Sequence, residues 1–130
     1  MPTKLIRETV QRFCDERGVV FEPLPGECLA TQRNSHVVVS RPGAVRGNHY
    51  HLKGTETLVV CGPALVRIRH DGITEDITIP PENIYRLVIP PKVAHAIKNT
   101  GSEDSLLVAF NTEPHDREKP DLVEEVLIPW

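Results

Sequence analysis

The chain has 130 residues, 39% of them hydrophobic and 25% charged, which allows one globular domain and little more. Its net charge is −3 with basic and acidic residues interspersed, so no basic stripe indicates nucleic acid or an anionic membrane as a partner. Twelve prolines spread along the chain exclude a helical bundle or coiled coil, because each one interrupts a helix or a central strand.

The first segment carries the only helical periodicity. Apolar side chains recur there at spacings of three and four, namely Leu5, Ile6, Val10, Phe13 and Cys14. Gly18 follows as a stop signal. The pattern predicts one α-helix over Thr3–Glu16, so we expect an N-terminal helix in residues 1–17 before a single barrel domain in residues 18–130.

Beyond Gly18 the pattern changes to short runs rich in valine and isoleucine, separated by turn residues. The predicted strands are Val19–Glu22, His36–Ser40, Leu58–Cys61, Ala64–His70, Asp76–Ile79, Tyr85–Ile89, Ala94–Lys98, Ser105–Phe110 and Leu122–Ile128. Strands at this spacing are typical of a sandwich or barrel. Asp71-Gly72 predicts a hairpin turn, because this dipeptide accommodates positive φ. The predicted fold class is therefore all-β.

Three features bear on the cellular compartment. The longest uncharged apolar stretch, Leu58 to Val66, is about half the length of a membrane span. Lys4, Arg7 and Glu8 stand where a signal peptide would have its apolar core. Three cysteines at wide spacings predict neither a disulfide framework nor a cysteine zinc site. We expect a reduced, cytoplasmic protein.

Three histidines and a glutamate carry the main chemical signal. His49 and His51 are two positions apart, which on an extended chain points both rings to one face. Glu56 follows closely, and His95 lies in a separate run of apolar β residues. If the two stretches lie side by side, three imidazoles and a carboxylate converge. Such a set suits zinc, iron(II), manganese or nickel.

Two motifs resemble those of the cupin superfamily. Residues 43–51, with Glu56 and Gly62, resemble the first motif, which is glycine, five residues, His-x-His, then a glutamate and a glycine. Residues 90–99 resemble the second motif, proline-x-glycine-x-x-histidine-x-x-x-asparagine. The resemblance implies a double-stranded β-helix, or jelly-roll barrel, that binds one divalent metal ion. The ligands that it implies are His49, His51, Glu56 and His95.

The chain departs from the family pattern at three points. Lys92 replaces the glycine of the second motif, and Ile84 stands where that motif usually opens with glycine; both changes would alter a turn and leave the ligand intact. Five residues, where the general pattern has six, separate Glu56 from Gly62. Because side chains alternate along a strand, this shortening can turn Glu56 to the other face unless a bulge compensates, so the ligand role of Glu56 stays open.

The chain is further similar to the C-terminal cupin domain of bifunctional capsular-polysaccharide enzymes, which make UDP-sugars. The similarity runs from about Asp15 to the C-terminus. It rests on residues 46–51, 58–60, 68–69, 89–91, 95, 111–114, 116 and 119–121. In that family the cupin binds zinc and epimerises a 4-keto sugar nucleotide, while a separate reductase domain finishes the reaction. The resemblance implies a homodimeric zinc-dependent epimerase or isomerase in polysaccharide biosynthesis, with any reduction left to another protein.

Epimerisation requires a base near the metal. A metal that polarises a ketone oxygen acidifies the neighbouring carbon, whose proton a side chain titrating near neutrality then removes. His36, Glu56 and Tyr85 are the nearby types, and the sequence does not choose among them. Packing is the favoured interpretation of Tyr85. His36, His70 and His115 are each expected to be structural, although His36 becomes a candidate base if its strand face lines the barrel.

Three arginines are candidates for substrate binding. Arg46 lies near the histidine pair, where the resemblance implies a substrate contact. Arg67 and Arg69 share one face of a strand and together could grip a pyrophosphate. A solvated strand face accounts for these two residues equally well.

Three functions stay open at this point, because one barrel hosts many unrelated activities. The first is a metal-dependent epimerase or isomerase of a nucleotide-linked keto sugar. The second is a non-catalytic cupin that binds a sugar or an organic acid and regulates a partner enzyme. The third is an iron-dependent dioxygenase of small molecules.

Overall fold

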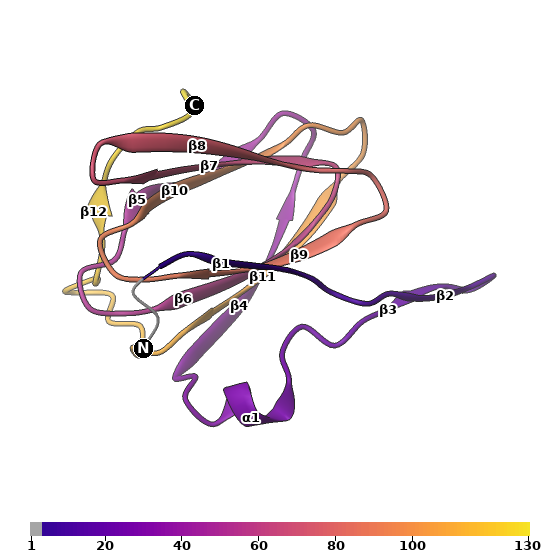
Figure 1. Cartoon of the computed structure of the whole chain (residues 1–130), viewed down its shortest axis with the longest axis horizontal. Helices are drawn as coiled ribbons and strands as arrows, with labels where there is room; N and C mark the ends of the chain where they lie inside the picture. Colours follow the sequence, from indigo (N-terminus) through magenta and orange to yellow (C-terminus); the bar gives the residue numbers. More distant parts are fainter. Residues whose placement is uncertain (1–3) are drawn as a thin grey trace.

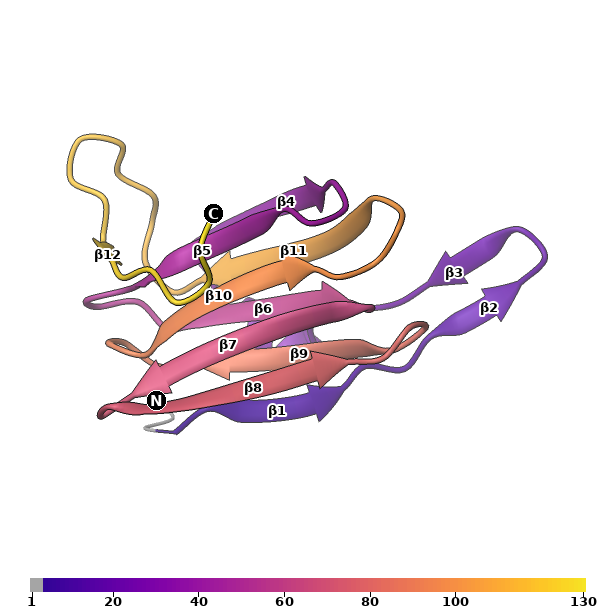
Figure 2. The same cartoon turned by 90° about the horizontal axis from the view of Figure 1, so that it is seen from above.

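Residues 4–130 are described by the computed structural model as two facing five-stranded antiparallel sheets, a two-stranded hairpin and one short helix (Figures 1 and 2). The first sheet has the order β1 (Ile6–Thr9), β9 (Ile84–Ile89), β6 (Glu56–Cys61), β11 (Ser105–Asn111) and β4 (Asn34–Ser40). The second has the order β12 (Val123–Glu124), β5 (Val45–Tyr50), β10 (Ala94–Asn99), β7 (Ala64–His70) and β8 (Ile73–Ile79). The hairpin is β2 (Phe13–Asp15) with β3 (Gly18–Val20), and the helix is α1 (Gly26–Leu29).

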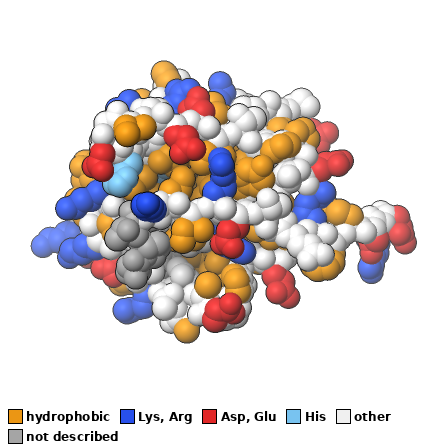
Figure 3. All heavy atoms as spheres, in the orientation of Figure 1, with side chains coloured by type: hydrophobic (Ala, Val, Ile, Leu, Met, Phe, Trp, Pro, Cys, Tyr) orange, Lys and Arg blue, Asp and Glu red, His pale blue; other side chains and the backbone are white. Residues whose placement is uncertain are grey.

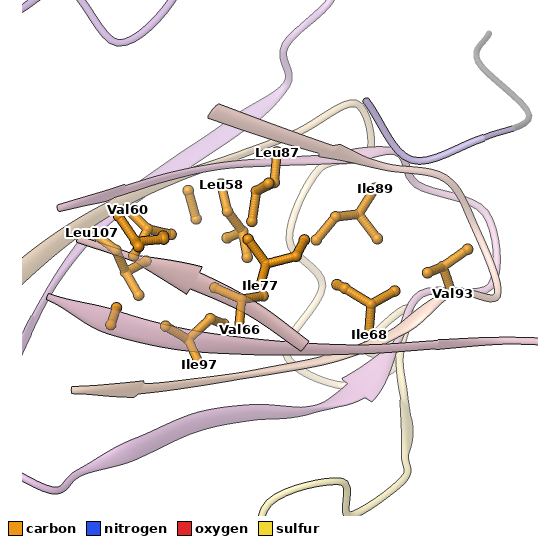
Figure 4. Close-up of a cluster of buried hydrophobic side chains, with 13 residues drawn as sticks. Leu58, Val60, Val66, Ile68, Ile77, Leu87, Ile89, Val93, Ile97 and Leu107 are labelled. Carbon is orange, nitrogen blue, oxygen red and sulfur yellow. The ribbon is translucent and has the colours of Figure 1, made fainter. Parts of the chain in front are cut away.

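The main core lies between the two sheets. Alternation along β7 explains it, since Val66 and Ile68 are buried there while Arg67 and Arg69 point outward. Figure 4 shows inward side chains of both sheets meeting, among them Ile77, Leu87 and Ile89. Burying a side chain of this size stabilises the fold by about 1.5–3 kcal/mol. This packing fixes the separation of the two sheets.

The two ends of the chain cover the outer faces of the sheets. Val10 and Leu24 pack with Val59, Ile84 and Phe110 on the first sheet. Leu127 and Ile128 pack with Ala94 and Ala96 on the second sheet, where Tyr50 also lies. The hairpin β2–β3 projects away from both sheets (Figure 2).

The all-β class is confirmed, but the helix predicted over Thr3–Glu16 is wrong for the residues that the structure describes; Thr3 lies outside them. Ile6–Thr9 pairs with β9, and Phe13–Asp15 forms the hairpin instead. An isolated helix of about 14 residues is marginal in water, whereas the edge of a sheet offers backbone partners. At the turn, the Asp15 carboxylate accepts hydrogen bonds from the Arg17 backbone and side chain. The one described helix, Gly26–Leu29, was not predicted.

The last predicted strand, Leu122–Ile128, shortens to Val123–Glu124. The cause is the buried amide of Asn48. Its oxygen accepts hydrogen bonds from the backbone N–H groups of Leu127 and Ile128, and its nitrogen donates to the carbonyl of Ile128. These side-chain contacts replace strand pairing at the end of the chain.

The surface carries charges of both signs. On the face that Figure 3 presents, acidic and basic side chains are interspersed with hydrophobic ones. Between residues 4 and 130, no helix reaches the length and apolar character that a membrane crossing requires.

Candidate metal centre

Three imidazoles and one carboxylate converge at one end of the barrel. His49 lies on β5 and His51 directly follows that strand, whereas Glu56 opens β6 and His95 lies near the start of β10. Each of the four offers one ligand atom, and these atoms all lie within 4.8 Å of one another. Ligands from both sheets therefore meet at a single point.

A bulge brings β5 and β10 together at the ligands. His95 pairs with His49, but the next residue, Ala96, pairs with Gly47, so Asn48 is the extra residue on β5. Gly47 has φ +87°, and a Cβ atom there would lie 2.8 Å from the carbonyl oxygen of His95. Only glycine permits both this conformation and this close approach.

Glu56 faces the histidines despite the shortened motif. One of its carboxylate oxygens lies 3.0 Å from Nε2 of His51, and the other lies 3.0 Å from Nε2 of His95. Strand β6 runs from Glu56 to Cys61 and pairs with β9 and β11 without a shift of register, so side chains alternate regularly along it. Glu56 thus keeps the same face as Leu58, which lines the same cavity.

Hydrogen bonds orient two of the imidazoles. Nδ1 of His51 lies 2.9 Å from the carbonyl oxygen of Asp121, and Nδ1 of His95 lies 3.0 Å from that of Val93. A carbonyl only accepts, so both Nδ1 atoms carry the proton and donate it. The Nε2 atoms then face the centre. In metal sites, hydrogen bonds to the outer ring nitrogen orient histidine ligands in the same way.

The donor set fits a divalent metal ion. Nε2 of His95 is buried and makes no hydrogen bond, although a carboxylate oxygen of Glu56 lies close to it. A lone pair of a neutral imidazole facing a carboxylate is unfavourable unless a positive charge lies between them. Three nitrogens and one oxygen are donors that suit zinc and neighbouring first-row metals.

The pKa shifts follow from burial and from the central carboxylate. Burial, reinforced by His95, lowers the pKa of His49 to about 4, so this imidazole is neutral at physiological pH. Burial opposes charge on His51 as well, but its hydrogen bond to Glu56 leaves the pKa of His51 raised. Burial would raise the pKa of Glu56, but the adjacent imidazoles of His51 and His95 hold it well below its usual range. The centre therefore contains an ionised carboxylate.

The four side chains lie in the wall of a cavity of about 220 Å³. Its other polar lining residues are Asn34, His36, Arg46, Asn111 and His115, and its apolar ones are Val38, Leu58, Ile97, Leu107, Ala109 and Leu122. Such a mixed lining with a few convergent polar groups is typical of small-molecule sites.

Two further predicted site residues reach this cavity and a third does not. His36 lines it from β4, and Arg46 lines it from β5, with its Nε 3.4 Å from the hydroxyl of Ser40. Tyr85 pairs with Val60, four residues along β6 from Glu56, or about 13 Å away. It packs against the main core, so the structure does not bring Tyr85 to the candidate centre.

Arg67 and Arg69 also lie away from the cavity, on the outer face of β7. Arg67 donates two hydrogen bonds to the carboxylate of Asp76, at 2.7 and 3.1 Å. Arg69 donates to the hydroxyl of Thr74 and lies 3.5 Å from the carboxylate of Glu125. The structure does not bring them to the cavity, because Val66 and Ile68 fill the inner face of this strand, and their substrate binding stays a prediction.

Sequence reasoning missed several residues around the centre. Asn34, Asn111 and His115 line the cavity, and Asp121 holds His51. His115 follows the run of residues that carried the family resemblance, yet a lone histidine on a loop gives no local sign of a role. Asp121 lies 70 residues from His51, so only the fold reveals their contact.

Comparison with known proteins finds one matching family model and several similar proteins. Residues 13–123 match the family model of the polysaccharide biosynthesis C-terminal domain. The chain is 30% identical over 124 residues to UDP-2-acetamido-2,6-beta-L-arabino-hexul-4-ose reductase of Pseudomonas aeruginosa, covering 93% of this chain and 32% of that protein. It therefore spans about a third of that relative's length.

A second relative is of similar size. The chain is 31% identical to the probable low-salt glycan biosynthesis epimerase Agl13 of Haloferax volcanii, with 86% of this chain and 80% of that protein covered. Among solved structures, the 3'-monoepimerase ChmJ of Streptomyces bikiniensis in complex with dTDP-quinovose matches with a TM-score of 0.73. That match has 19% identity and covers 92% of this chain and 68% of the other. The likeness confirms the predicted cupin barrel.

Proposed function

The chain belongs to the family of polysaccharide biosynthesis C-terminal domains, and from this premise we propose that it is a metal-dependent epimerase or isomerase of a nucleotide-linked 4-keto sugar. The observation that carries the proposal is the convergence of His49, His51, Glu56 and His95 on one cavity wall. The relatives named an epimerase and a hexulose reductase support this class of substrate.

We propose that these four side chains hold zinc, with iron, manganese and nickel as the alternatives that the same donors accept. A bound metal ion would supply Lewis acidity toward the ketone oxygen of the substrate. Glu56 has both carboxylate oxygens engaged with histidines, which supports a ligand role for it and leaves the proton transfer to another residue.

His36 is the base in this proposal. It lines the cavity from β4, outside the four donors, and takes the proton from the carbon next to the ketone while the electron pair moves to the carbonyl oxygen. Epimerisation returns a proton from the opposite face, which requires a second group. His115, from the segment between β11 and β12, is the other imidazole in the lining outside the donor set, and we assign it that step.

Substrate binding is assigned to Arg46. Its guanidinium lies in the cavity lining, and Ser40 is its hydrogen-bond partner, at a long 3.4 Å. A cavity of about 220 Å³ accommodates a sugar ring, so the nucleotide would extend beyond it. Arg46 at that boundary can bind a phosphate oxygen of the linker. We also propose that the protein is a homodimer, as the family resemblance implies.

The test is solvent exchange of substrate hydrogen. Zinc-loaded protein is incubated in D₂O with a panel of UDP- and dTDP-linked 4-keto sugars, and deuterium on carbon is followed by NMR. We expect incorporation that is lost in His51→Ala. The matched control is His70→Ala, because His70 is an exposed imidazole outside the cavity lining.

Two results would contradict the proposal. Binding of these sugars by zinc-loaded protein without any exchange would indicate the non-catalytic binding module. Oxygen consumption by the iron-loaded protein would indicate the dioxygenase instead.

A further inference from the structure

One acidic side chain outside the donor set holds the turn between two of the ligands. Residues 52–55 connect His51 to Glu56, and the backbone N–H groups of the first three point to the carboxylate of Asp121. The donor–acceptor distances are 3.2 Å from Leu52, 3.0 Å from Lys53 and 2.9 Å from Gly54. Hydrogen bonds to an ionised acceptor are stronger than those between neutral groups.

The same residue also contacts a ligand directly. The backbone carbonyl of Asp121 accepts the Nδ1–H of His51, which leaves Nε2 of this imidazole directed at Glu56. Asp121 thus holds the turn between His51 and Glu56 in two ways. Its carboxylate accepts hydrogen bonds from backbone N–H groups of the turn, and its main-chain carbonyl accepts one from the His51 ring. Its neighbour Leu122 lines the cavity, so the contacts of Asp121 also help to position part of the cavity wall.

The other half of the turn is held independently. The Thr55 N–H donates to the hydroxyl of Thr112, and the Thr112 N–H donates to the carbonyl of Thr55. Gly54 lies against the side-chain amide of Asn111, leaving no room for a Cβ atom. The Glu56 end of the turn would therefore stay in place without Asp121, whereas the His51 end would lose its restraint.

Loss of that restraint has a predictable consequence for the centre. Each backbone residue freed from one conformation gains conformational entropy. Residues 52 and 53 are exposed, so water can replace the carboxylate at their N–H groups. A mobile turn would leave His51 and Glu56 without a fixed separation, and metal binding would have to order the turn again.

We propose that Asp121 is a positioning residue of the metal centre, which fixes the turn between His51 and Glu56 and the tautomer of His51. This inference rests on the metal binding that the proposed function includes. The four candidate ligands lie between residues 49 and 95, and Asp121 adds a supporting contact to them from the C-terminal segment.

The test compares Asp121→Ala, Asp121→Asn and a matched control, Asp116→Ala. Asp116 lies in the same segment, and its carboxylate likewise accepts backbone hydrogen bonds, but from Glu118 and Lys119 and not from the turn between His51 and Glu56. Zinc affinity is measured by competition with a chelator, and the geometry of the centre by the visible absorption of the cobalt-substituted protein.

We expect Asp121→Ala to weaken zinc binding by about 10- to 100-fold and to change the cobalt spectrum. Asp121→Asn should fall between it and the wild type, because an amide offers one acceptor oxygen where the carboxylate offers two. Asp116→Ala should keep both the wild-type affinity and the wild-type spectrum.

Wild-type affinity and spectrum in Asp121→Ala would overturn the inference, even if that variant melts at a lower temperature, since the residue would then be structural only. If Asp121→Ala fails to fold, unchanged affinity and spectrum in Asp121→Asn would overturn it equally. A wild-type protein that binds no zinc or cobalt would overturn the proposed function, and this inference with it.

Discussion

The two lateral sides of the barrel interior have opposite chemistry. The closed side, formed by inward residues of β7, β8 and β9, is filled by aliphatic side chains such as Ile68, Ile77 and Leu87. The open side, formed by inward residues of β4 and β5, carries His36 and His49 and borders the cavity. Both sides belong to the same pair of sheets.

The register shows how sharply one side gives way to the other. Across the first sheet, Ile89 pairs with Glu56, Glu56 with Asn111, and Asn111 with Asn34, so one row passes from apolar to polar in four strands. An ionised carboxylate is costly to bury without partners. The closed side supplies the burial energy that holds such a group in place, and the open side supplies the chemistry.

The largest expected effect on stability comes from a substitution on the closed side. Leu87 is fully buried, and Leu87→Ala should lower the free energy of unfolding by about 2–5 kcal/mol, as measured by urea denaturation. The zinc affinity of the folded protein should stay unchanged. Ile73→Ala, at an exposed aliphatic residue of β8, should change stability by no more than about 0.5 kcal/mol. Loss of zinc binding in folded Leu87→Ala would contradict the separation of the two sides.

Metal addition acts on the open side alone. Zinc at 100 times its dissociation constant should raise the free energy of unfolding by about 2.7 kcal/mol in the wild type. His95→Ala should show no such rise, because it removes a buried ligand, whereas His115→Ala should keep it. Equal stabilisation of the wild type and His95→Ala would place the ion elsewhere.

Gly47→Ala strains the contact between β5 and β10. A positive φ costs an alanine about 1 kcal/mol, and the close approach to the His95 carbonyl should bring the total to about 2 kcal/mol. Gly72 has a similar φ of +77° but open space around it, so Gly72→Ala should cost only the about 1 kcal/mol of the positive φ. We also expect Gly47→Ala, but not Gly72→Ala, to weaken zinc binding, because its Cβ would displace His95 from His49. Equal zinc affinities in the two variants would contradict this link.

The smallest expected effects concern the arginines on the two faces of the second sheet. Arg46→Ala should raise the KM for a sugar nucleotide about tenfold, since it removes one charged hydrogen bond. Arg67→Ala removes an exposed pair with Asp76 and should leave KM, kcat and zinc affinity unchanged. A raised KM in Arg67→Ala would indicate that the outer face of β7 contributes to substrate binding.

The convergence of the three histidines was predictable from the sequence because it depends on short-range order and on two motifs. His49 and His51 are two positions apart and turn to the same side, and a second motif placed His95 in the neighbouring strand. The orientation of Glu56 was left open, because a residue count cannot distinguish a deletion inside a strand from one in the turn after it. The structure turns the Glu56 carboxylate to His51 and His95.

Other features depended on contacts that no local pattern contains. The apolar residues from Leu5 to Cys14 suit a helix by spacing, but pairing of Ile6–Thr9 with β9 overrides that preference. Arg67 and Tyr85 were correctly placed on strands, but which strand face or strand end meets the ligands follows from sheet register alone. Asp121 and His115 reach the site from the C-terminal segment, whose course only the whole fold determines.

Metal stoichiometry tests the central claim most directly. Protein purified without chelator is analysed by inductively coupled plasma mass spectrometry, beside His95→Ala and His70→Ala prepared in the same way. The account predicts one divalent transition-metal ion per chain in the wild type and in His70→Ala, and none in His95→Ala. A wild-type protein that carries no metal and takes up none on addition of zinc, iron, manganese or nickel would contradict it.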